Sequence, residues 1–250
     1  MEAYRADASL KGKLRRRLVR GLHRRPLIQG PDRPMVSFTF DDAPASAARA
    51  GAELLEARGL KGVFYACAGL AGTEGPMGRY AEAADYARLA GAGHEIGCHT
   101  FSHLDCGRAP GTAALAEAVC NADQLEAWDI PYPITFAYPY GDVAAGPKAI
   151  LAQRFKLLRA LHPGLVEKGC DLNQAPAVGI EGRHGEATAR RWLEQARARK
   201  AWLILYTHDV QVDPSQWGCT PTALAGLIDA ALDGGFDVVT VAEGARRLSA

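Results

Sequence analysis

The sequence lacks long apolar runs and paired cysteine motifs. No stretch approaches the ~18 consecutive apolar residues of a membrane-spanning helix, and no apolar core of a secretory signal peptide is present near the N-terminus. The six cysteines are scattered over 250 residues without a C-x-x-C pair, which is typical of reduced thiols rather than of a disulfide framework. No Ser-, Gly- or Pro-rich linker divides the chain. We therefore expect a single cytosolic domain.

Acidic residues are scarce only near the N-terminus. Residues 1–33 contain ten Lys or Arg and three Asp or Glu, so this arm has a net charge of +7 and the remaining chain −6. Leu10, Leu14, Leu18 and Leu22 recur every four residues, which predicts a helix with an apolar stripe among cations. Peripheral contact with an anionic membrane is one interpretation; a solvated helix packed on the domain and a partly disordered arm are the others. We expect no nucleic-acid partner, and the pattern predicts no oligomeric state.

Beyond the arm, segments typical of strands alternate with segments typical of helices. This alternation predicts βαβ units and a parallel sheet. Seven or eight such units fit a closed α/β barrel, with an open doubly wound sheet as the alternative. The predicted strands are residues 35–40, 61–67, 94–99, 134–138, 155–160, 177–181, 202–207 and 236–240, and the predicted helices are residues 46–58, 80–90, 111–128, 147–154, 185–200 and 222–232, followed by a short last helix.

Polar residues follow several of these strands, where ligands bind in both architectures. Asp41 and Asp42 follow the first strand, His99 and His103 the third, and His208 the strand that ends near residue 206. Adjacent residues of a strand point to opposite faces, so the two carboxylates should have different roles. Two histidines with a carboxylate from another strand form an N,N,O ligand set for Zn²⁺ or another divalent ion, with positions open for water and substrate.

The segments T-F-D-D, H-T-F-S-H, F-A-Y-P-Y-G and Y-T-H-D, in this order and spacing, resemble the successive motifs of the polysaccharide deacetylase family, the chitooligosaccharide deacetylase-like carbohydrate esterases. The resemblance divides the chain into the basic arm, 1–33, and a catalytic domain, 34–250. It implies an α/β fold, a single-domain deformed (β/α) barrel with about seven parallel strands. It also implies one divalent metal ion and the hydrolysis of N- or O-acetyl groups of a carbohydrate. Zinc is the first candidate, and cobalt or manganese are alternatives.

The same resemblance implies a role for each motif residue. Asp42, His99 and His103 would be the metal ligands. Asp41 would be the general base for the attacking water, and His208 the general acid that protonates the departing sugar amine or alkoxide.

The third and last motifs add substrate contacts and depart from the family pattern. A backbone N–H around Tyr140, in the turn that begins at Pro139, would stabilise the tetrahedral oxyanion. Tyr206 stands where the family usually has leucine and would border the pocket for the acetyl methyl group. Ala137 stands near the position of an arginine that usually orients the base, and Arg183 is the candidate replacement. The acidic partner of the acid histidine is not recognisable, and the candidates are Asp171, Glu181 and Asp209.

These departures leave two other functions open. One is a non-catalytic sugar-binding protein on the same barrel, and the other is a metal-dependent hydrolase of a non-sugar amide or ester. For a deacetylase in the cytosol, we expect a nucleotide sugar, a lipid-linked sugar or a glycan precursor as the substrate, and the basic arm fits the lipid-linked case.

Overall fold

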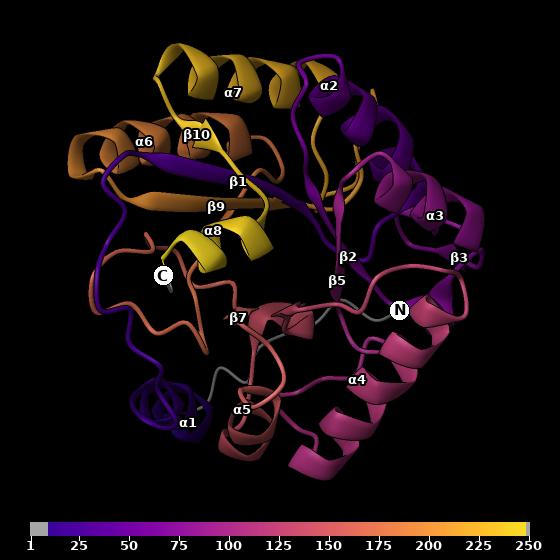
Figure 1. Cartoon of the computed structure of the whole chain (residues 1–250), viewed down its shortest axis with the longest axis vertical. Helices are drawn as coiled ribbons and strands as arrows, with labels where there is room; N and C mark the ends of the chain where they lie inside the picture. Colours follow the sequence, from indigo (N-terminus) through magenta and orange to yellow (C-terminus); the bar gives the residue numbers. More distant parts are fainter. Residues whose placement is uncertain (1–9, 249–250) are drawn as a thin grey trace.

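The computed structural model describes residues 10–248, and its centre is a curled sheet of parallel strands inside a ring of helices (Figure 1). The sheet consists of β1 (Met35–Phe40), β2 (Val63–Ala66), β5 (Glu95–Cys98), β6 (Thr135–Ala137), β7 (Leu157–Arg159), β8 (Val178–Gly179), β9 (Trp202–Thr207) and β10 (Asp237–Val238). Seven of these strands are ordered β7-β6-β5-β2-β1-β9-β8, and β10 pairs with the start of β1. Every pair in this sheet is parallel. The predicted deformed (β/α) barrel is confirmed.

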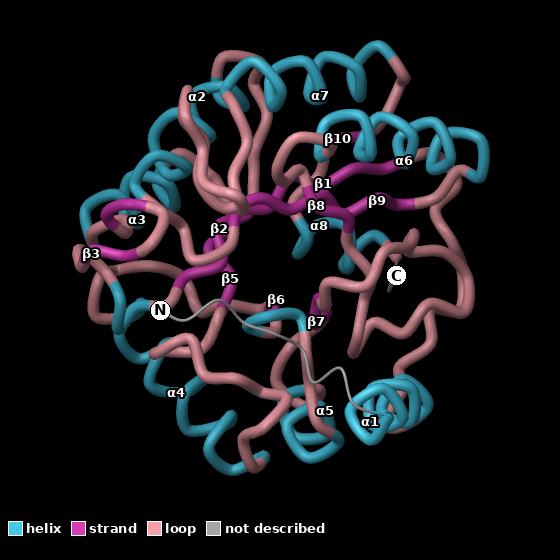
Figure 2. Tube along the Cα trace, turned by 180° about the vertical axis from the view of Figure 1, so that it is seen from behind, coloured by secondary structure: helices cyan, strands magenta, loops and turns pink. Residues whose placement is uncertain are grey.

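Helices cover the outside of the curled sheet (Figure 2). Most predicted helices are present with bounds shifted by a few residues, and the helix predicted over 46–58 begins as a π-helical turn. A short hairpin that the sequence did not predict, β3 (Glu74–Gly75) with β4 (Gly78–Arg79), precedes α3. The helical segments are α1 (Leu10–Gly21), η1 (Ala47–Gly51), α2 (Ala52–Glu56), η2 (Ala68–Leu70), α3 (Ala83–Gly91), α4 (Gly111–Glu126), η3 (Pro139–Gly141), α5 (Ala145–Leu151), α6 (Gly185–Arg199), α7 (Pro221–Asp233) and α8 (Val241–Arg247).

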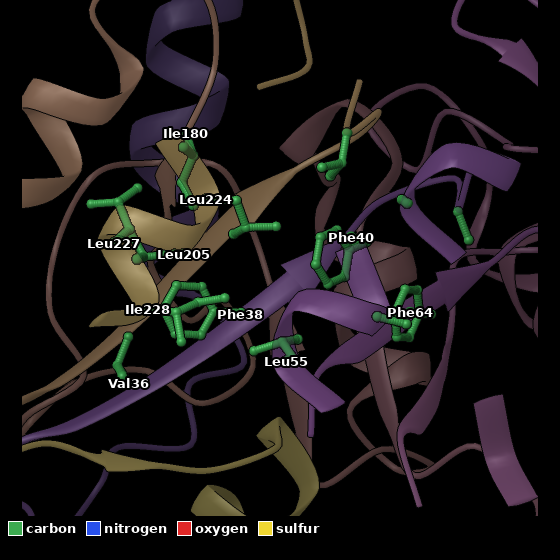
Figure 3. Packing of buried hydrophobic residues seen from close by; sticks show 14 of the residues in the cluster. Val36, Phe38, Phe40, Leu55, Phe64, Ile180, Leu205, Leu224, Leu227 and Ile228 are labelled. Carbon is green, nitrogen blue, oxygen red and sulfur yellow. The ribbon is translucent and has the colours of Figure 1, made fainter. Parts of the chain in front are cut away.

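Strand β1 lies at the centre and is buried along its whole length. It pairs with β9 from Met35, opposite Trp202, to Phe40, opposite Thr207. Its outward side chains pack in one apolar cluster with residues of α2 and α7 (Figure 3). Burial on both faces explains why the strand is a continuous apolar run interrupted only by small hydroxyl residues. The outward side chains are Val36, Phe38 and Phe40, and the cluster includes Leu55, Leu224, Leu227 and Ile228.

The barrel is deformed between β7 and β8, which do not pair directly. The segment that follows β7 folds back beside it instead. Leu158 N–H donates to the carbonyl of Leu172, and Ala160 N–H donates to the carbonyl of Ala175. This segment contains no helix, and α1 from the N-terminal arm packs over this side of the barrel.

Helix α1 is held against the domain by polar contacts of Arg15 and Lys148. Arg15 donates to the carbonyl of Gly107 at 2.7 Å and to Asp142 Oδ2 at 2.5 Å. The buried Lys148 Nζ donates to the carbonyl of Val19 at 3.0 Å. Of the interpretations offered for the arm, the packed helix describes the position of residues 10–21, whereas residues 1–9 and the side chain of Leu10 lie outside the described part. No helix within residues 10–248 is long and apolar enough to cross a membrane.

Candidate active site

The predicted ligand residues meet at the carboxyl ends of β1 and β5. One ligand atom each from Asp42, His99 and His103 lies within 4.8 Å of the others, and all three residues are buried. Asp42 Oδ1 is 3.5 Å from His99 Nε2 and 3.3 Å from His103 Nε2. The structure therefore brings together the three side chains that the sequence selected as a ligand set.

The orientation of His99 is fixed by the neighbouring strand. Its Nδ1 lies 2.8 Å from the carbonyl oxygen of Ala137 in β6. A carbonyl can only accept, so Nδ1 carries the proton and the lone pair of Nε2 faces Asp42. A hydrogen bond of this kind is common behind metal-binding histidines, because it sets both the tautomer and the ring orientation. His103 differs, since its buried Nδ1 has no hydrogen-bond partner among the described residues.

The protonation states of these groups suit a cation. Burial lowers the pKa of both His99 and His103 to about 4, so both imidazoles are neutral at pH 7 and their lone pairs are available. Burial likewise raises the pKa of Asp42 above its ordinary value. A buried carboxylate beside two neutral imidazoles is a donor set that fits a divalent ion such as zinc. The buried thiol of Cys67, which the sequence analysis did not select, donates to the His99 carbonyl at 3.0 Å and lies 3.8 Å from Asp42 Oδ1.

Asp41 faces a different partner from Asp42. Its Oδ1 accepts a hydrogen bond of 2.5 Å from the guanidinium of Arg159, which ends β7 and is fully buried. The Arg159 guanidinium lies 5.1 Å from the ring centre of Tyr65 and 5.4 Å from that of Tyr206. Burial raises the pKa of Asp41, but the charge of Arg159, with smaller contributions from two histidines, outweighs burial and holds this pKa below its ordinary value.

Arg159 is thus the cation beside Asp41 that the sequence analysis did not identify. Arg183, which was the candidate replacement for the missing arginine, is exposed on the loop before α6, and Asp41 forms its ion pair with Arg159 instead. The available sequence signal was a cation at the end of the predicted strand 155–160. Such a residue needs a buried partner, because an unpaired charge inside a barrel is costly.

His208 is a further titratable group at this end of the barrel, and Glu181 is its acidic partner. Its Nδ1 lies 3.1 Å from Glu181 Oε1 and 3.2 Å from the carbonyl oxygen of Trp217. Burial lowers the pKa of His208, but the hydrogen bond to Glu181, together with the charges of Asp41 and Asp42, raises it to about 9. His208 is therefore protonated at neutral pH.

The two other acidic candidates have partners elsewhere. Asp171 pairs with the buried Lys148 at 2.7 Å. Asp209 accepts hydrogen bonds from the backbone N–H and the hydroxyl of Ser215, at 2.8 and 2.5 Å, and so shapes the loop after β9.

The residues expected to contact substrate surround these groups. The Tyr140 ring packs edge-on against His103, with ring centres 4.4 Å apart, and Pro139 is buried at the start of the same turn. Tyr206 is also buried, and its ring centre is 6.4 Å from that of His208. The role of a backbone N–H near Tyr140 as an oxyanion donor stays a prediction.

Left-handed backbone conformations are concentrated in the loops of this site. Asp42, Thr100, His103 and Tyr140 have φ of +57°, +63°, +61° and +59°. Such conformations are strained for residues other than glycine and persist only where the surroundings hold them. Glu117 of α4, which the sequence analysis missed, supplies part of that support: it accepts hydrogen bonds from the backbone N–H groups of the H-T-F-S-H loop and from a serine hydroxyl.

Fold and site together define a (β/α)-barrel protein with a candidate metal-binding and acid–base centre at the carboxyl ends of its strands. A family model described as polysaccharide deacetylase matches residues 29–154. The chain belongs to the polysaccharide deacetylase family, and it is a hydrolase of that carbohydrate deacetylase and esterase class. Comparison with curated proteins gives no significant match.

Solved structures with the same fold carry related descriptions. A Mycobacterium smegmatis protein provisionally described as a polysaccharide deacetylase has a TM-score of 0.70 at 18% identity, over 91% of this chain and 95% of the other. The chitin deacetylase of Colletotrichum lindemuthianum has a TM-score of 0.63 at 16% identity, over 88% and 91%. A family 4 acetyl xylan esterase from Clostridium thermocellum, in complex with a cobalt ion, has a TM-score of 0.59 at 20% identity, over 84% and 89%. At these identities the likeness is one of fold.

Proposed function

We propose that this chain removes acetyl groups from a carbohydrate by metal-dependent hydrolysis, with Asp42, His99 and His103 as the metal ligands. The observation that carries the proposal is the contrast between the two titratable groups beside this set. Asp41 is held ionised by Arg159, and His208 is held protonated by Glu181. A base and an acid with separated pKa values, close to one ligand set, are what hydrolysis of an amide or ester requires.

A divalent ion, when bound, would supply Lewis-acid chemistry by polarising the acetyl carbonyl and lowering the pKa of water. Asp41 accepts a proton from the attacking water as the new C–O bond forms. His208 donates its proton to the sugar nitrogen or oxygen as the bond to the acetyl carbon breaks. The products are acetic acid, which loses a proton to solvent as acetate, and the free amine or hydroxyl of the sugar. The proton that Asp41 accepted then passes to His208, which restores the ionised Asp41 and the protonated His208.

Arg159 and Glu181 are positioning residues in this scheme. Arg159 keeps the pKa of Asp41 low and donates a hydrogen bond to its Oδ1, so Oδ2 of Asp41 remains available for water. Glu181 holds His208 through Nδ1, so the opposite ring nitrogen is the one that donates to the leaving group. A backbone N–H near Tyr140 would stabilise the oxyanion, and Tyr206 with Pro139 would border the acetyl group.

Zinc is the proposed ion, with cobalt or manganese as alternatives, since two imidazoles and one carboxylate bind all three. The family supports an N- or O-acetylated carbohydrate as the substrate. Among the proteins with the same fold, one is described as a chitin deacetylase and another as an acetyl xylan esterase, so both types of acetyl group are represented.

Acetate release from a panel of N- and O-acetylated mono- and oligosaccharides tests the proposal. We expect the zinc-loaded protein to release acetate. The rate of release should fall about 10² to 10⁴-fold in the Asp41→Asn variant, whose side chain has the same size but cannot accept the proton. The proposal is wrong if no acetylated sugar is hydrolysed while non-sugar amides or esters are, or if glycans bind and no acetate is released. Undiminished turnover by Asp41→Asn would overturn the assigned base.

A further inference from the structure

The outer face of α1 carries an exposed apolar stripe. Leu14 and Leu18 are each 58% exposed and Leu22 is 45% exposed, although leucine is among the residues most often buried. At 3.6 residues per turn, side chains four apart lie one above the other, so Leu14 and Leu18 form one stripe along the helix, and Leu22 follows directly after the helix ends at Gly21. A different side of α1 contacts the domain, where Val19 is buried. The stripe is therefore not needed to attach the helix.

Cations accompany the stripe, and acidic residues are absent from its surroundings in the sequence. Arg17 is exposed on the face of α1 next to the stripe. Arg20 is exposed further round the helix, and Arg24 is exposed just beyond its end. No Asp or Glu occurs between Ala8 and Pro31. Long cationic side chains can keep their charge at a polar surface while their stems cover apolar neighbours.

The cationic side continues into an open cleft of about 510 Å³. Arg20, Arg24, Lys168 and Arg199 line it. Its two carboxylates already have partners, because Glu167 pairs with Arg199 and Asp171 pairs with Lys148. The cleft thus retains a positive balance where a phosphate head group could enter.

We propose that the exposed side of α1 docks on a membrane of anionic phospholipids, with Leu14, Leu18 and the following Leu22 as its apolar contacts and with Arg17 and Arg20 beside them. Apolar side chains next to arginines match the acyl boundary and the phosphate layer of such a membrane. Pairing with a second copy of this chain through the same face would instead place arginines against arginines, which charge repulsion opposes.

Helix α1 lies beside the loops of the candidate site, so docking would also position the site; this step rests on the proposed function. Arg15, on the same helix, is bonded to Asp142 and to the Gly107 carbonyl. These two residues belong to the loops that carry Tyr140 and His103. Docking through α1 therefore brings the mouth of the barrel close to the lipid surface, where it can reach an acetylated saccharide that is anchored to a lipid.

Flotation of the full chain with vesicles tests the docking. We expect binding to vesicles of equal parts phosphatidylcholine and phosphatidylglycerol, and little binding to phosphatidylcholine alone, because each cationic residue at an anionic surface contributes about fivefold. Leu14→Ser with Leu18→Ser should reduce binding about tenfold or more. The matched control is Leu232→Ser, which changes a leucine that is 41% exposed on α7, at the far edge of the molecule from α1 (Figure 1).

Equal binding by the wild type and the double variant would overturn the proposal, as would the absence of vesicle binding. A dimer of the wild type that the double variant converts to a monomer, without vesicle binding, would assign the face to a second copy. Acetate release from a free acetylated sugar should be the same in the wild type and the double variant, whereas release from an N-acetylated glycolipid in the vesicles should fall with binding. Absence of release from the free sugar by the wild type would refute the proposed function and leave the vesicle result intact.

Discussion

Substitution of Arg159 by methionine tests how Asp41 is kept ionised. Methionine retains an unbranched chain between the rings of Tyr65 and Tyr206 but removes the cation that donates to Asp41 at 2.5 Å. Both partners are buried, with Arg159 0% and Asp41 2% exposed. Removing one partner of a buried ion pair leaves a buried charge without compensation, and this costs about 3–5 kcal/mol. We expect the Arg159→Met variant to lose stability of that order at pH 7.

The loss should depend on pH in a defined direction. In the wild type the pKa of Asp41 lies below its ordinary value of 3.8, so the stabilisation by Arg159 is present above about pH 4 and is lost as the pH falls further. In the variant, burial is opposed only by the smaller contributions of His99 and His208, so the pKa of Asp41 should rise above the unfolded value. Ionisation then destabilises the fold as the pH rises, so the difference from the wild type should grow from about pH 4 to pH 7.

Urea unfolding of the metal-free protein measures this difference, and Asp41→Asn provides the control background. With a neutral residue at position 41, Arg159 is itself a buried charge without a partner, so Arg159→Met should be close to neutral or stabilising there. The acid limb of the pH dependence of kcat/KM should also move to higher pH in the single variant. An equal cost of Arg159→Met in both backgrounds, unchanged between pH 4 and 7, would refute the reasoning.

Three further substitutions test other parts of the account. Glu181→Gln removes the main group that raises the pKa of His208 to about 9, so the basic limb of the pH–rate profile should move to lower pH; an unmoved limb would exclude Glu181 as the positioning group. In the wild type, the raised pKa of His208 stabilises the fold fully below about pH 6.5, and this contribution is lost as the pH rises through 9. The same substitution should remove this contribution. Lys148→Met leaves Asp171 without its partner and should cost about 3–5 kcal/mol in urea unfolding, whereas the exposed Lys156→Met should cost less than about 0.5 kcal/mol. Gly97→Ala places a Cβ 2.5 Å from the ring of Tyr65, which packs on Arg159. It should lower the free energy of unfolding by about 1–3 kcal/mol and reduce turnover. The control Gly91→Ala meets nothing within 4 Å and should be tolerated.

The ligand set was predictable because it depends on local rules. Parallel strands bring the residues after their carboxyl ends to one edge, so Asp42, His99 and His103 could be expected to meet before any contact was known. The curled sheet of parallel strands followed from the alternation of strands and helices in the same way.

The supporting contacts were not predictable because they join residues far apart in the chain. Arg159 lies 118 positions after Asp41, and only the closure of the barrel places β7 opposite β1. Glu181 could not be separated from Asp171 and Asp209, since the choice depends on which carboxylate reaches His208 across a loop. The Leu14 and Leu18 stripe was visible as a pattern, but which face of α1 the domain would cover was not.

Acetate release by the metal-free protein, before and after zinc is restored, tests the central claim most directly. The account predicts that the metal-free wild type releases no acetate, that one equivalent of zinc restores release, and that Asp41→Asn binds zinc equally well without restoring it. Release by the metal-free wild type at the rate of the zinc-loaded protein would contradict the claim that Asp42, His99 and His103 hold an ion required for the reaction.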